Sequence, residues 1–279
     1  MLEKMAKALG ADARFSAWQV TEVRGRSTQR YDVFGVPEAR RVVETAGLEV
    51  RVHVPRAEDG GDAYIGESSF VVDVTADVQP QLDAAYARAR LVKNKKWTLP
   101  GAHDVVAVNA VDSGIVEGAA DACDRVMSTI AKGVPSASSI RCCAAEVFCD
   151  FRRVHLVNSR GLDRQREETS AYVEYVLLAK GSGGDETETY SSTKARRLPE
   201  LDLEARVDGD ARAVSLALSA KTPETAVVDV VLTEQGIEEI YDAFIAHAAG
   251  GAVDEGWSKL ERGKHVVADR AGEALTLVS

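Results

Sequence analysis

Polar and apolar residues alternate along much of the first part of the chain, a pattern typical of β-strands with one buried face. The clearest example is 169–179, where Ala171, Val173, Tyr175 and Leu177 share one face. Similar patterns predict strands at 14–23, 29–34, 48–54, 68–74, 140–151 and 187–196, with a Gly25-containing turn between the first two. We expect Gly161 to turn the chain after 155–158 in a left-handed conformation.

Apolar residues recur at steps of three and four in other segments and predict helices at 77–92, 112–131 and 208–220. Asp112 or Ser113 can cap the second helix, and Pro80 suits the first turn of the first one. A group of strands followed by a helix occurs twice, which indicates an α+β fold. We expect a two-layer region of mixed sheet and helices, which an internal duplication could have produced. We place this N-terminal region at 1–222 and the start of a central α/β region at 223–279.

The segment 226–265 joins a predicted strand to a predicted amphipathic helix. Residues 226–233 form a β-branched run of the kind that fills a buried strand. The following helix is expected at 234–249, with Gly250-Gly251 ending it as a C-cap. We expect this helix to pack on the strand with Ile240, Phe244 and Ile245 facing inward.

Several stretches, in this order along the chain, resemble the TldD/PmbA (TldE) family. They are 66–72 with 94–100, Asn158-Ser159-Arg160-Gly161-Leu162 with the charged strand after it, 188–221, and 226–267 with its Gly-Lys-x-Val ending. The resemblance covers nearly the whole chain from about residue 17 and is strongest to the PmbA/TldE-like branch without zinc. It also implies a C-terminal β-rich domain that would follow Ser279 and is lacking here.

In the family's catalytic branch the helix at 234–249 carries His-Glu-x-x-x-His for zinc. The resemblance places Asp242, Ala243 and His247 at the positions of the first His, the Glu and the last His. We therefore expect no catalytic residue, no metal ligand and no cofactor in this chain, and zinc in a TldD-type partner. On an ideal helix Asp242 lies about 140° from His247, so Asp242 is expected to face solvent. His247 is interpreted as a structural residue at the rim of the apolar stripe, with a vestigial metal ligand as the alternative.

Other catalytic patterns are missing from the sequence. It contains no Gly-x-Ser-x-Gly elbow, Walker loop or dinucleotide fingerprint. Glu167 and Glu168, beside Arg164 and Arg166, are interpreted as members of cross-strand ion pairs, with acid–base chemistry as the alternative. The glycine-rich stretch 181–184 is read as a linker because a phosphate loop would lie between a strand and a helix.

The composition of the chain argues against several classes of protein. The hydrophobic content of 45% with 28% charged residues is typical of a soluble globular protein, and no apolar stretch is long enough to cross a membrane. A net charge of −10 argues against a nucleic-acid surface, and residues 1–10 are too charged for a signal peptide. We therefore predict a cytoplasmic protein. Its four cysteines are interpreted as reduced thiols on strands: Cys123, Cys142, Cys143 and Cys149.

Together these observations predict a TldE/PmbA-like subunit of a TldD/TldE-type metallopeptidase complex that matures or degrades peptides. The partner would be a TldD-like catalytic subunit or, in a homodimer, a second copy. An apolar closing strand at 274–278 would leave an unpaired edge, which also favours association. Two alternatives stay open: a stand-alone peptide-binding or scaffold protein, and a hydrolase whose catalytic residues lie in a missing C-terminal extension.

Overall fold

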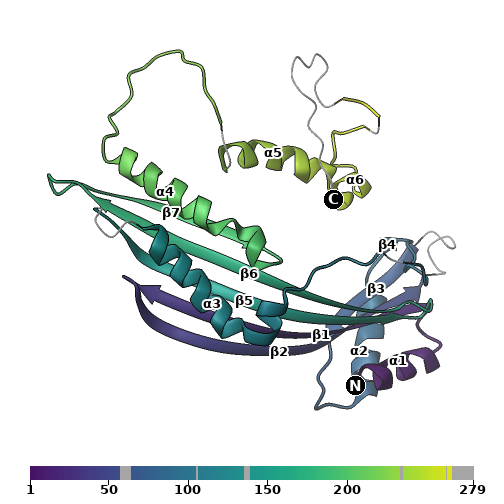
Figure 1. Ribbon diagram of the computed structural model, residues 1–279. Helices are drawn as coiled ribbons and strands as arrows, with labels where there is room; N and C mark the ends of the chain where they lie inside the picture. The colour runs from purple at the N-terminus through teal and green to yellow at the C-terminus, as the bar shows by residue number, and fades with distance from the viewer. Residues whose placement is uncertain (57–63, 105, 135–138, 233–234, 262, 266–279) are drawn as a thin grey trace. The chain divides into compact units, whose positions relative to one another are not determined.

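A computed structural model describes residues 1–56, 64–104, 106–134, 139–232, 235–261 and 263–265 of the protein. The chain divides into two units, Met1–Lys221 and Thr222–Ser279, which are described separately. The first unit combines one large antiparallel sheet with helices (Figure 1), so the predicted α+β class is confirmed.

Seven strands form the sheet, in the order β4-β3-β2-β1-β5-β6-β7, and every neighbouring pair is antiparallel. The strands are β1 Ala17–Val33, β2 Val36–Pro55, β3 Tyr64–Val71, β4 Asn94–Lys95, β5 Ile140–Asn158, β6 Asp163–Lys180 and β7 Glu186–Ala195. The helices of this unit are α1 Leu2–Ala11, α2 Val78–Ala89, α3 Ser113–Gly133 and α4 Leu203–Ala217, with the short 3-10 helix η2 Leu198–Leu201 before α4.

The two halves of this unit repeat one order of elements. A helix, three strands and a second helix follow one another as α1-β1-β2-β3-α2 and again as α3-β5-β6-β7-α4. The first strands of the two halves, β1 and β5, pair with each other in the middle of the sheet. This repetition of order is the arrangement that an internal duplication would produce.

Each half has its own hydrophobic core between its helices and its strands. In the first half, α1 and α2 cover β1 to β3, with Met5, Leu82 and Val50 fully buried. In the second half, α3 and α4 cover β5 to β7 around Val147, Val173, Tyr175, Leu177 and Val207. Two residues of β1 mark the two cores. Val20 belongs to the first core, and Thr28 lies beside the second, where its backbone oxygen accepts a hydrogen bond from Cys123 of α3. The two residues are eight positions apart on β1. Because strand side chains alternate between faces, an even spacing places both cores on the same face of the sheet.

Several predicted elements are confirmed, with bounds that differ by a few residues. Helices α2 and α3 match the predicted segments, and the Asp112 side chain caps α3 by accepting a hydrogen bond from the Gly114 backbone N–H. Gly161 has a φ of 80° and turns the chain between β5 and β6, as predicted. The Asn158 side chain supports this turn because its Oδ1 accepts from the backbone N–H groups of Arg160 and Leu162.

The predicted turn at Gly25 is wrong. Gly25 lies in the middle of β1, which continues to Val33, and the hairpin turn to β2 lies at Phe34 and Gly35. Both turn residues have positive φ angles, 48° and 74°, which suits a two-residue hairpin. The helix α1 was not predicted, although Leu2, Met5 and Leu9 form its buried face.

The predicted strand at 226–233 is also wrong, because residues 226–232 form no regular secondary structure and Thr233 lies outside the described residues. The helix that follows it does form, as α5 Gln235–Ala248, but residues 226–232 do not provide the strand on which it was expected to pack. Ile240 and Ile245, expected to face inward, are 50% and 48% exposed. Phe244 is half-buried. Gly250 and Gly251 begin a further short helix, α6 Gly250–Asp254, instead of capping α5. The predicted closing strand at 274–278 lies outside the described residues.

Candidate functional site

The face of the sheet opposite the two cores, here called the open face, is covered by no helix of Met1–Lys221 among the described residues. The register of β1, β5, β6 and β7 sorts its side chains into rows that run across the strands. The first row contains Tyr31, Glu146 and Glu174, and the second contains Gln29, Phe148, Tyr172 and Lys194. The third row contains Ser27, Asp150 and Ser170. The fourth contains Gly25, Arg152 and Glu168. The open face therefore changes from acidic, through aromatic, to basic and polar.

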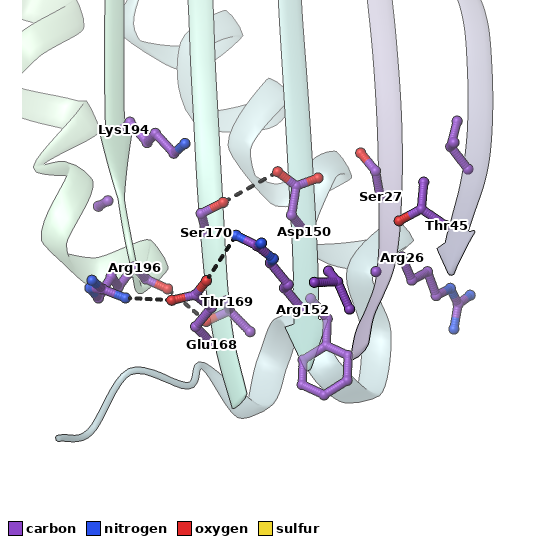
Figure 2. A pocket seen from close by; sticks show the side chains of 15 residues that line it. Arg26, Ser27, Thr45, Asp150, Arg152, Glu168, Thr169, Ser170, Lys194 and Arg196 are labelled. Carbon is purple, nitrogen blue, oxygen red and sulfur yellow. Dashed lines mark hydrogen bonds and ion pairs between the residues drawn. The ribbon is translucent and has the colours of Figure 1, made fainter. Parts of the chain in front are cut away.

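A basin of about 690 Å³ opens at the basic end of this face. It crosses five strands and is lined by side chains that include Thr45, Asp150, Arg152, Glu168 and Lys194 (Figure 2). Glu168 accepts ion pairs from three guanidinium groups, those of Arg152 at 3.7 Å, Arg166 at 3.4 Å and Arg196 at 3.2 Å. The side chain of Ser170 donates to Asp150 at 3.2 Å.

The charges of the basin favour an anionic group. Its lining on the open face contains three basic side chains, Arg152, Lys194 and Arg196, against two acidic ones, Asp150 and Glu168. Lys194 forms no ion pair within the described part of the chain. Guanidinium and ammonium groups near hydroxyl donors are the groups that bind a carboxylate.

Gly25 lies at the centre of the basin, where a side chain would not fit. A Cβ atom at this position would lie 2.7 Å from Thr45 Oγ1 and 3.9 Å from the Phe151 carbonyl oxygen. Glycine inside a strand marks a site where another chain or ligand can approach the backbone closely. The hydroxyl side chains of Ser27 and Thr45, which also line the basin, support binding at this point.

Between the acidic end of the open face and the basin, aromatic rings form a continuous row. Tyr31 and Phe148 have ring centroids 5.6 Å apart, and Phe148 and Tyr172 have centroids 5.7 Å apart. The guanidinium of Arg41 lies 4.5 Å from the centre of the Tyr31 ring, a cation–π contact. The row joins the acidic end to the basin.

The basin presents charged and hydroxyl side chains that can bind a ligand. No histidine lines the basin, and the hydrogen bond of Ser170 goes to Asp150 without a further base to orient it. Among the residues that the structure describes, no three His, Cys, Asp or Glu side chains come together as a metal site. No helix of the described chain is long and apolar enough to cross a membrane.

The residues at the degenerate zinc-motif positions lie in the second unit. Asp242, Ala243 and His247 are all on α5, where Asp242 and Ala243 are exposed and His247 is half-buried. His53 and His155 lie on β2 and β5 of the first unit. That Asp242, Ala243 and His247 bind no metal stays a prediction.

The charged pair at 167–168 forms the cross-strand ion pairs that the sequence predicts. Glu167 binds Arg153, and Glu168 lies directly opposite Arg152 on β5. Three of the cysteines lie on β5 as predicted, but Cys123 lies on α3, so its placement on a strand is wrong. All four cysteines are free thiols, and burial raises the pKa of Cys142 to about 11, which disfavours a reactive thiolate there.

The open face was not predicted as a site from the sequence. The even-numbered positions from Glu168 to Glu174 carried a signal, because polar and aromatic residues alternate there with the buried ones. Their neighbours on β1 and β5 follow only from the strand register, which the sequence did not reveal.

Comparison with known proteins identifies the fold. No family model and no curated protein matches the sequence. Among solved structures, TldE from Thermococcus kodakarensis matches with a TM-score of 0.58 at 17% identity, over 76% of this chain and 47% of that one. Proposed modulators of DNA gyrase from Thermotoga maritima and Bacteroides thetaiotaomicron match with TM-scores of 0.64 and 0.67 at 12% and 11% identity.

The gyrase-modulator matches cover 81% and 91% of this chain and 50% and 58% of those chains. The chain therefore spans about half the length of the solved structures it matches. At these identities the likeness concerns the fold alone, and the fold is TldE/PmbA-like, as the sequence resemblance implies.

Proposed function

From this TldE/PmbA-like fold, we propose that the protein is a TldE-type subunit of a TldD/TldE-type metallopeptidase complex that matures or degrades peptides. The observation that carries the proposal is the structural similarity to TldE from Thermococcus kodakarensis, which extends over 76% of the chain. In this proposal the zinc and its ligands belong to a TldD-like partner, and this chain contributes a surface for the peptide.

The open face of the sheet supports a binding role. It offers charged groups, hydroxyls and aromatic rings over several strands, and its basin of about 690 Å³ is large enough for a few residues of an extended chain. Such a surface suits a subunit that holds the substrate while another subunit supplies the chemistry.

The proposal is tested by separating this chain from its partner. The purified chain should contain no stoichiometric zinc and should not hydrolyse unstructured peptides. Adding a TldD-like protein with an intact His-Glu-x-x-x-His motif should give a stable complex whose hydrolysis exceeds that of the partner alone. Zinc content is measured by elemental analysis and hydrolysis by mass spectrometry of the products.

Two variants serve as controls for this test. A partner in which the motif Glu is replaced by Gln should still form the complex but should lose hydrolysis, because the base that activates the zinc-bound water is gone. Replacing His247 of this chain by Ala should change neither zinc content nor activity. Chelator-sensitive hydrolysis by the isolated chain, lost in His247→Ala, would contradict the proposal.

A further inference from the structure

The acidic end of the open face holds two carboxylates on neighbouring strands. Glu146 on β5 and Glu174 on β6 lie directly opposite each other in the strand register, and neither forms an ion pair within the described residues. Tyr172 and Tyr190 both donate their hydroxyls to Glu174 Oε2, the latter at 3.0 Å. Like charges directly opposite on neighbouring strands are destabilising. Burial raises the pKa of Glu146, Glu174 raises it further, and Arg41 opposes both.

The aromatic row beside these carboxylates is a surface that accepts cations. Arg41 already lies over Tyr31, and Phe148 and Tyr172 continue the row to Glu174. A carboxylate pair next to aromatic rings attracts an ammonium or guanidinium group through both charge and cation–π contact. This end of the face therefore complements a basic side chain.

The basic end of the face lies at a defined distance from the acidic end. Glu146 and Arg152 are six positions apart on β5, so their side chains point to the same face about 20 Å apart. In an extended peptide, side chains six positions apart have the same separation and also share one side. Arg152 and Arg196, which flank Glu168 at the basin, would then meet a carboxylate of that peptide.

We propose that the open face binds an extended peptide segment that carries a basic side chain and, six residues away, an acidic side chain. The basic group of the peptide lies at Glu146 and Glu174, and its backbone passes over the ring of Phe148. The acidic group of the peptide lies at Arg152 and Arg196, beside the space that Gly25 leaves open. The peptide as occupant rests on the proposed function, whereas the charges and their spacing come from the face itself.

The shape of the face favours a peptide over a second copy of this chain. The basin is a hollow across five strands, and two hollows placed against each other would leave its polar groups without partners. A single extended strand is narrow enough to enter the hollow and long enough to reach both charged ends.

Equilibrium binding to the full chain tests this proposal without a catalytic partner. The probes are nonapeptides with blocked ends, Lys at position 2 and Glu at position 8, or the reverse order, with Thr and Ala elsewhere. Isothermal titration calorimetry should show that one of the two orders binds at least about tenfold more tightly than a Lys/Lys or Glu/Glu peptide. A peptide with the charges five positions apart should also bind weakly, because it places them on opposite sides of the strand.

Variants of the chain locate the bound peptide. Glu174→Gln should remove the preference for the Lys-containing peptide, and Arg152→Gln the preference for the Glu-containing one. Glu167→Gln, on the opposite face of the same strand, is the matched control and should leave binding unchanged. Circular dichroism of each variant confirms that the fold is retained.

Equal binding of all the peptides, or an equal loss in Glu167→Gln, would overturn the proposal. Self-association of the chain that is weakened by Glu174→Gln and competes with the peptides would overturn it as well, in favour of a second copy. If peptide binding fails while a TldD-like partner still gains activity from this chain, the proposed function stands and this inference alone is lost.

Discussion

The two faces of β6 differ completely, although their residues alternate along one strand. On the covered face Val173 and Leu177 are fully buried and Tyr175 is 1% exposed. On the open face Glu168, Tyr172 and Glu174 are only half-buried and carry charges, hydroxyls and ring contacts. The covered face thus holds the groups that stabilise the fold, and the open face holds the groups that could recognise a ligand.

The difference also separates two kinds of polar group. On the covered face the Tyr175 hydroxyl reaches Asp210 of α4 at 2.6 Å, so a polar atom in the core has its partner. On the open face Glu146 and Lys194 have no ion pair in the described part of the chain. Since polar groups in a core are satisfied within the protein, the unpaired charges of the open face are the ones that remain for a partner.

The largest expected difference between the two faces is in the free energy of unfolding of variants at two adjacent leucines on β6. Leu177 is fully buried in the second core, whereas Leu178 is half-buried on the open face. Leu177→Ala should lower the free energy of unfolding by about 3 kcal/mol, because it removes buried methyl groups and leaves a cavity. Leu178→Ala should lower it by less than about 1 kcal/mol. Urea denaturation followed by circular dichroism measures both, and similar losses would mean that the open face is also a core.

Substitutions of two glycines compare the covered and open faces through a smaller change in the free energy of unfolding. A Cβ at Gly66 would lie 2.2 Å from the Ala89 backbone oxygen, because α2 covers that position. Gly66→Ala should therefore cost about 2 kcal/mol of unfolding free energy through overpacking. Gly25→Ala on the open face meets only the Thr45 side chain, so its cost of about 1 kcal/mol should fall when Thr45→Ala is added.

These glycine predictions are checked by urea denaturation of the three variants. A loss in Gly25→Ala that Thr45→Ala does not relieve would show that backbone, and not the threonine side chain, limits the space on the open face. Peptide binding by Gly25→Ala adds a second readout, since a close approach of a ligand backbone would be blocked without a change in the core.

The local patterns of the sequence predicted the covered face well. The alternation at 169–179 and the stripe of α2 report burial directly, because one buried face of a strand or helix needs apolar residues at a fixed period. Gly25 misled the analysis, since glycine marks both turns and close contacts, and only the neighbouring Thr45 of β2 shows which applies. The run 226–232 misled it too, because β-branched residues form a strand only with a neighbouring strand to pair with.

The open face could not be predicted in the same way. Glu146 and Glu174 are far apart in the sequence and meet only because β5 and β6 pair in one register. A shift of one residue would move either side chain to the other face. The pairing of Tyr31 with Glu146 depends in addition on contact between β1 and β5, the first strands of the two halves.

The smallest expected effect concerns Glu146 and depends on pH. Burial and Glu174 raise the pKa of Glu146 in the folded protein. The folded state therefore binds its proton more tightly than the unfolded state, and stability falls as the pH rises from the ordinary glutamate range through the raised pKa. Glu146→Gln carries no such charge and should be more stable than the native chain by about 0.5 kcal/mol at pH 7, within the range of cross-strand charge pairs.

This difference should close below about pH 4, where Glu146 is protonated in both states. Thermal unfolding of both proteins at pH 4 and pH 7 checks the sign, with Glu167→Gln as the control, because Glu167 has the partner Arg153 and should lose rather than gain stability at pH 7. A Glu146→Gln variant that is less stable at pH 7 would mean that a cation of the protein already neutralises the carboxylate pair. In that event the acidic end of the open face would have no charge left for a basic ligand, and the comparison between the two faces would reduce to one of burial.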